Sequence, residues 1–120
     1  MLRYFEYSEF DSPDLPGSGK MYMDLVFLEI LDQVRFMFCE PIYINSGYRT
    51  KEHNDSLPNS SPDSSHLKGL AVDIKCTNSR DRYTLINLFI THKVTRFGIS
   101  KNFLHVDMDK SKAQNLIWTY

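Results

Sequence analysis

Two short stretches of the chain carry side chains that could hold a metal ion. The first covers residues 64–74 and places Asp73 seven residues after His66. The second, Phe-Leu-His-Val-Asp, contains His105 and Asp107. Catalytic zinc sites use three nitrogen or oxygen ligands from the protein and leave one position open. Neither cysteine lies in these stretches, so the spacing indicates a mononuclear zinc hydrolase site.

Both stretches resemble β-strands, and this decides which side chains can meet. Side chains alternate across a strand, so Asp73 lies on one face and its apolar neighbours on the other. By the same rule His105 shares a face with Asp107. If the two strands are neighbours, Asp73 meets His105 on a polar face, and His66 reaches in from the preceding loop. A structural His–Asp hydrogen bond would explain the same pattern, because a buried carboxylate needs a partner.

The elements around these stretches predict an α+β fold. Apolar residues recur at helical spacing from Met21 to Phe38, and a second helix is expected over about 80–92, capped by Asn78 or Ser79. The predicted short strands are 42–45, 70–76, 96–100 and 103–108, while 1–20 is expected to be an irregular arm and 51–65 a surface loop. Short consecutive strands favour a small antiparallel sheet with helices packed on one face. A chain of 120 residues suits one domain, 1–120.

Composition and charge limit the partners that the chain can have. The net charge is −1 and no run of Lys or Arg stands out. Because binding of phosphates needs clustered positive charge, we expect no nucleic-acid partner. No stretch reaches the roughly 20 apolar residues of a membrane span, and the first twenty residues lack the features of a secretory signal. We therefore expect a monomer made in the cytoplasm, without membrane insertion.

Three motifs together resemble a known enzyme family. They are Ser-Gly-Tyr-Arg ending at Arg49, Ser-x-His-x-x-Gly-x-Ala-x-Asp from Ser64 to Asp73, and His-x-Asp beginning at His105. Their order is similar to that of the zinc D-alanyl-D-alanine carboxypeptidase and peptidoglycan endopeptidase family (LAS-type). The likeness covers nearly the whole chain and is greatest with the small bacterial and phage branch. The Hedgehog signalling domain shares the fold, so the resemblance implies a Hedgehog-like architecture.

The resemblance implies a role for each matching residue. His66, Asp73 and His105 would bind one zinc ion. Arg49 would hold the substrate carbonyl and stabilise the oxyanion, because a fixed guanidinium beside developing negative charge lowers the barrier. Ser64 would contact the substrate. A surface salt bridge for Arg49 and a plain loop position for Ser64 are the alternatives.

The general base is where the chain departs from the family. Several relatives have a carboxylate three residues before the last zinc histidine, and this chain has Asn102 there. Asparagine cannot accept a proton. Asp107 lies on the same strand face as His105, about 7 Å along, and is our predicted base, with Asp109 as the alternative. Asp107 could instead orient a zinc-binding histidine.

The resemblance implies a zinc metallopeptidase that cleaves an amide bond in peptidoglycan stem peptides. Both carboxypeptidase and endopeptidase action fit the motifs. In place of the Gly-Gly turn of close relatives, this chain has Pro58-Asn-Ser-Ser-Pro-Asp63 before His66, which would reshape the groove. We expect an endolysin-like enzyme encoded by a phage or prophage, which reaches the cell wall through a separate pore. A catalytically inactive zinc-binding module and a metal-free scaffold or virion component are the other hypotheses.

Overall fold

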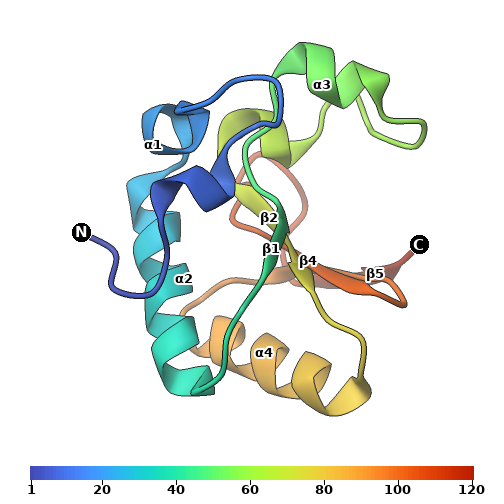
Figure 1. Cartoon of the computed structure of the whole chain (residues 1–120). Coiled ribbons are helices and arrows are strands. Elements are labelled where there is room, and N and C mark those ends of the chain that lie inside the picture. Colours follow the sequence, from blue (N-terminus) through green and yellow to red (C-terminus); the bar gives the residue numbers. More distant parts are fainter.

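One mixed five-stranded sheet forms the centre of the computed structural model, which describes residues 1–120 (Figure 1). In chain order the strands are β1 (Ile44–Ser46), β2 (Ala71–Lys75), β3 (Arg96–Ile99), β4 (Phe103–Asp107) and β5 (Leu116–Thr119). They lie in the order β1-β2-β4-β3-β5. The helical elements are η1 (Tyr7–Phe10), α1 (Ser18–Tyr22), α2 (Leu25–Phe38), α3 (Lys51–Ser56), η2 (Ser65–Lys68) and α4 (Ser79–Thr91). The predicted α+β class is confirmed.

The sheet differs from the predicted antiparallel sheet at one edge. The first four strands in chain order do pair antiparallel, but β5 pairs parallel with β3. The hairpin of β3 and β4 brings the end of β4 beside Arg96, and β5 begins at Leu116 beside the same residue. A short connection therefore suffices to start a strand that runs in the direction of β3. The predicted strands end at residue 108, so β5 was not among them.

The helices differ from the predicted ones mainly at their ends. The stretch predicted as one helix from Met21 to Phe38 is divided, because Met23 is extended and the Asp24 side chain caps α2 by accepting from the Phe27 N–H at 2.9 Å. The predicted cap at Asn78 of α4 is confirmed. Six residues of the predicted 51–65 loop form α3, which Thr50 caps. None of the helices has the length and apolar character needed to cross a membrane.

The two faces of the sheet have different chemistry. One residue from each of four strands lies in register on one face, and these residues are Asp73, His105, Gly98 and Trp118. The opposite face, with Val72, Val106 and Phe97, packs into the core. The helices α2 and α4, which contact each other, cover this apolar face (Figure 1). Their residues in the core include Phe27, Leu31, Val34, Leu85 and Phe89.

Candidate metal centre

Three side chains from different elements converge on the polar face of the sheet. Asp73 of β2 lies directly opposite His105 of β4, and His66 comes from η2, the turn before β2. The Oδ1 atom of Asp73 lies 3.3 Å from His66 Nε2 and 3.0 Å from His105 Nδ1. All three ligand atoms lie within 4.8 Å of one another. The neighbouring strands and the converging trio that the sequence predicted are therefore present.

The turn that carries His66 is held at both ends. Ser64 caps η2 by accepting from the His66 N–H at 3.3 Å. At the other end Gly69 has a φ of +69°, and a Cβ there would collide with the backbone of Tyr22. Glycine is needed because other residues rarely adopt this conformation. The Arg49 N–H also donates to the His66 carbonyl at 3.1 Å, so hydrogen bonds of the backbone hold His66 in place.

Hydrogen bonds on the far side of each imidazole fix its orientation. The Nδ1 of His66 lies 2.7 Å from the carbonyl oxygen of Gly47, which can only accept, so Nδ1 carries the proton and Nε2 faces Asp73. The Nε2 of His105 lies 2.7 Å from Asp107 Oδ2, which leaves Nδ1 facing Asp73. Histidines that bind metals are held in this way by a carbonyl or a carboxylate.

The donor set fits a zinc ion. Zinc bonds of 2.0–2.1 Å in a tetrahedral arrangement place neighbouring ligand atoms about 3.3 Å apart. The two distances to Asp73 Oδ1, 3.3 and 3.0 Å, agree with this spacing. Two imidazole nitrogens and one carboxylate oxygen are also ligands that zinc uses in catalytic sites. His66, Asp73 and His105 thus form a candidate metal-binding group.

Burial and mutual hydrogen bonding shift the titration of all three residues. Burial lowers the pKa of His66, which favours the neutral form that a metal requires. Burial alone would raise the pKa of Asp73, but hydrogen bonds with His105 and His66 lower it overall. Burial alone would lower the pKa of His105, but hydrogen bonds with Asp107 and Asp73 raise it overall. In the absence of a metal, Asp73 is therefore an ionised carboxylate between two imidazoles.

Arg49 lies at the edge of the trio and is held by three acceptors. Its Nε donates to Ser46 Oγ at 3.1 Å, and one terminal nitrogen donates to Asn54 Oδ1 at 3.2 Å. The other terminal nitrogen lies 3.3 Å from Asp73 Oδ2. Only 13% of the side chain is exposed, so this contact is no freely solvated surface salt bridge. The structure brings the predicted arginine to the metal-binding group in a fixed position.

The trio opens into a groove of about 510 Å³. The 57–61 segment lines one part of the groove, and Phe103 and Tyr120 line another. Ser64 also lines it, so the serine predicted to contact a substrate faces the cavity while its Oγ caps η2. A substrate that enters the groove would reach Arg49 and the three ligand residues together.

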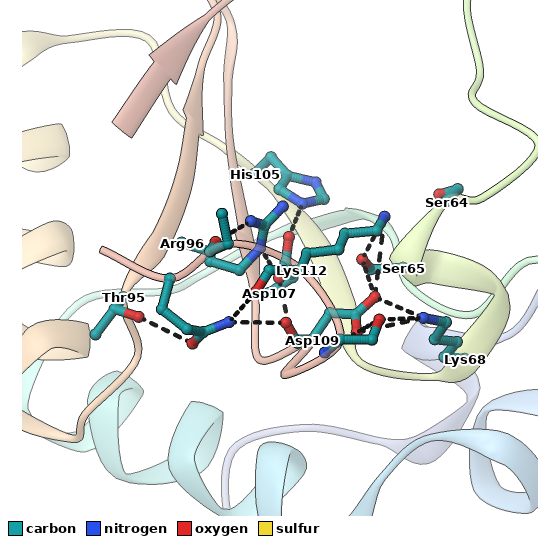
Figure 2. A network of polar contacts seen from close by, with 12 residues as sticks. Ser64, Ser65, Lys68, Thr95, Arg96, His105, Asp107, Asp109 and Lys112 are labelled. Atoms are coloured by element: carbon teal, nitrogen blue, oxygen red, sulfur yellow. Dashed lines mark hydrogen bonds and ion pairs between the residues drawn. The ribbon is translucent and has the colours of Figure 1, made fainter. Parts of the chain in front are cut away.

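The two acids considered as bases lie behind the metal-binding group. Asp107 is 1% exposed, and its Oδ1 accepts from Arg96 Nε at 2.7 Å while its Oδ2 accepts from His105 (Figure 2). Asp109 is also 1% exposed, and its carboxylate contacts Ser65 and Lys68 (Figure 2). Both oxygens of Asp107 thus have partners, and neither acid lines the groove.

Several residues that shape the site were not found from the sequence. Asn54, which holds Arg49, is completely buried in α3. Arg96 pairs with Asp107, and Trp118 packs against both Arg96 and His105. A buried acid in a strand, such as Asp107, needs a cationic partner, and this requirement could have pointed to Arg96. For Trp118 the sequence carried no comparable signal, because its contact depends on the parallel pairing of β5.

A family model described as Peptidase M15 matches residues 4–107, which include all three ligand residues and Arg49. No match to a curated protein is found.

Proposed function

The chain belongs to the peptidase M15 family, a family of metallopeptidases, and from this premise we propose that it hydrolyses an amide bond in peptidoglycan stem peptides with the help of one zinc ion. The observation that carries the proposal is the convergence of His66, Asp73 and His105 within 4.8 Å at a groove that also contains Arg49. A group with only a structural role would not need a groove and a fixed guanidinium beside it.

The chain supplies the ligands and the charge that such a reaction needs. When held by His66, Asp73 and His105, zinc would polarise the scissile carbonyl and lower the pKa of the attacking water. The hydrogen bonds to Gly47 and Asp107 keep both imidazoles turned toward Asp73, so little reorganisation is needed.

Arg49 is suited to stabilise the oxyanion that forms during hydrolysis. Arginine has five N–H donors. Three of them are used by Ser46, Asn54 and Asp73, which leaves two for a substrate oxygen. Because its partners hold the guanidinium in place before substrate binds, its charge is preorganised for the transition state.

Asp107 has two proposed roles, and its contacts support one of them more directly. As a base it would accept the proton of the attacking water, the role predicted from the sequence. Its bond to His105 and its ion pair with Arg96 support the role of orienting His105. Asp107→Asn separates the two roles. Loss of orientation should weaken zinc binding about 10- to 100-fold, whereas loss of the base should abolish turnover with zinc affinity unchanged.

A zinc-binding module without peptidase activity is the second candidate. The observation in its favour is that Asn102 stands where several relatives have a carboxylate, while both oxygens of Asp107 are already engaged. Such a module would bind zinc with the same three residues and would leave peptidoglycan intact.

Digestion of purified peptidoglycan tests the proposal. Zinc-loaded protein should release new peptide ends, identified by mass spectrometry, and His66→Gln should release none. Release of a single terminal amino acid would indicate a carboxypeptidase, and release of larger fragments an endopeptidase. If zinc-loaded protein binds the ion but frees no peptide, the peptidase proposal fails and the binding module is favoured. Action on the cell wall and a phage origin stay predictions.

A further inference from the structure

A buried carboxylate behind the metal-binding group connects the two elements that carry its histidines. We propose that Asp109 is a positioning residue, which ties η2 with His66 to β4 with His105 and so sets the spacing of the two histidines before a metal binds. The inference rests on the proposed zinc site. It concerns a residue beyond the segment 4–107 that matches the family.

On one side, the carboxylate of Asp109 holds both ends of η2. Its Oδ2 accepts from Ser65 Oγ at 2.7 Å and from Lys68 Nζ at 3.0 Å. Ser65 and Lys68 are the first and last residues of this four-residue turn, and His66 lies between them. A displacement of η2 relative to residue 109 would therefore break contacts at both ends of the turn.

On the other side, the backbone of Asp109 is connected to His105. The Asp109 N–H donates to Asp107 Oδ1 at 3.1 Å, and Asp107 Oδ2 accepts from His105 Nε2 at 2.7 Å. Figure 2 shows this continuous path from His105 through Asp107 and Asp109 to Ser65. One residue thus takes part in the contacts that fix both histidines.

The surroundings of Asp109 keep its carboxylate in this position. Its Oδ1 accepts from the N–H of Ser111 at 3.1 Å and from Ser111 Oγ at 2.6 Å, which leaves Oδ2 directed at η2. Lys112 reinforces the connection, because its Nζ donates to Ser65 Oγ at 3.1 Å (Figure 2). The same Nζ donates to the Asp63 carbonyl at 2.6 Å. A buried carboxylate with this many donors is costly to move, since movement would leave a charge without partners.

This arrangement gives Asp109 a different role from the one considered in the sequence analysis. Its two oxygens are used by Ser65, Lys68 and Ser111, and the residue does not line the groove. It acts on the reaction through the ligand histidines rather than by accepting a proton from water. Loss of a partner that directly holds a metal-binding histidine weakens metal binding about 10- to 100-fold. Asp109 acts one contact further away, through Asp107 and η2, so the lower end of this range is expected.

The test measures zinc affinity by titration against a competing chelator and, separately, the unfolding temperature of the metal-free protein. Asp109→Ala should weaken zinc binding about 10-fold, the lower end of the range for direct partners of a metal-binding histidine. Asp109→Asn should restore part of the affinity, because its amide oxygen can still accept from Ser65. The matched control is Asp32→Asn. Asp32 is also a buried carboxylate that accepts two backbone N–H groups, from Arg3 and Tyr4, but it is remote from the site. The Asp32→Asn variant should have a lower unfolding temperature than the wild type and the same zinc affinity.

Each other outcome decides against the inference. Unchanged zinc affinity in Asp109→Ala overturns it, as does an equal loss of affinity in the Asp32→Asn control, which would reflect general destabilisation. If Asp109→Ala does not fold, Lys112→Met is the second variant. It removes the Nζ contacts with Ser65 and Asp63 and the 3.9 Å ion pair with Asp109 Oδ2, and it should weaken zinc binding several-fold. Unchanged zinc affinity in Lys112→Met would also overturn the inference. A wild-type chain that binds no zinc overturns the proposed function as well. Wild-type binding with an unaffected Asp109→Ala overturns the positioning role alone.

Discussion

Replacing Gly98 with alanine should weaken both the fold and the metal site. Gly98 lies in β3 between His105 of β4 and Trp118 of β5, on the polar face. A Cβ at this position would lie 2.6 Å from Trp118 Nε1 and 2.7 Å from the Tyr120 hydroxyl. Real Cβ atoms do not come so close to other heavy atoms, so β5 or the Trp118 ring must move.

The size of the effect follows from the two ways in which the contact can be relieved. If the strands stay in place, the crowded contact costs about 1–3 kcal/mol, as overpacking does elsewhere. If the Trp118 ring swings away, it loses its contact with the His105 ring at 5.5 Å and its place under the Arg96 guanidinium at 5.0 Å. These contacts are worth about 0.5–1.5 and about 0.5–2 kcal/mol. The first route therefore costs about 1–3 kcal/mol of folding free energy, and the second costs about 1–3.5 kcal/mol.

The assay compares chemical unfolding of the metal-free variant with its zinc affinity. The control is Gly17→Ala, because Gly17 has a φ of +86° but no atom within 4 Å of an added Cβ. The Gly17→Ala control should lower the free energy of unfolding by about 1–2 kcal/mol through backbone strain and leave zinc affinity unchanged. Gly98→Ala should weaken zinc binding as well, since Trp118 packs on His105. A stability within about 0.5 kcal/mol of wild type, or full additivity with Trp118→Ala, would refute the reasoning.

Three further outcomes are expected. Arg49→Lys keeps the charge but loses the fixed fork, so kcat on a peptidoglycan peptide should fall about 100-fold or more while zinc affinity changes little; an unchanged kcat would exclude the oxyanion role. Burial alone would raise the pKa of Asp109, but hydrogen bonds led by those from Ser111 and Ser65 lower it overall. Its stabilisation of the metal-free protein is therefore present above pH about 4, the pKa in the unfolded chain, and is lost as the pH falls through the lower folded pKa. The difference in free energy of unfolding between wild type and Asp109→Asn should thus shrink as the pH falls below about 4. A difference that stays constant with pH would contradict this. Zinc at about 100 times its Kd should raise the free energy of unfolding by about 2.7 kcal/mol, a gain that EDTA removes and that His66→Gln should lack.

The pairing of Asp73 with His105 could be predicted because it depends on local alternation. Each residue lies in a short strand whose apolar side chains must face the core. The polar side chain must therefore lie on the opposite face, where Asp73 and His105 meet. The polar loop before β2 could be recognised in the same way, and it brings His66 to the end of the strand. These parts of the site follow from patterns that are only a few residues long.

The rest of the fold and of the site depends on contacts between segments far apart in the chain, or on elements without an apolar pattern. Two partners of Asp109, Ser65 and Lys68, come from η2, more than forty residues earlier, and no periodicity links these positions. The helix α3 is polar almost throughout, so apolar spacing could not reveal it; its cap at Thr50 and the buried Asn54 define it instead. The strand β5 was missed because its Leu-Ile-Trp-Thr sequence does not alternate between apolar and polar residues.

The register of β2 couples the apolar core to the metal-binding group. Val72 and Asp73 are neighbours in this strand, and they point to opposite faces. A slip of one residue would place the Asp73 carboxylate in the core and Val72 beside His105. Burying an unpaired carboxylate costs several kcal/mol, and the core would also lose Val72, which is fully buried. The apolar side of the sheet therefore selects the one register that places Asp73 opposite His105. Substitutions that keep the Val72 face packed should preserve the ligand geometry, even where they touch none of the ligands.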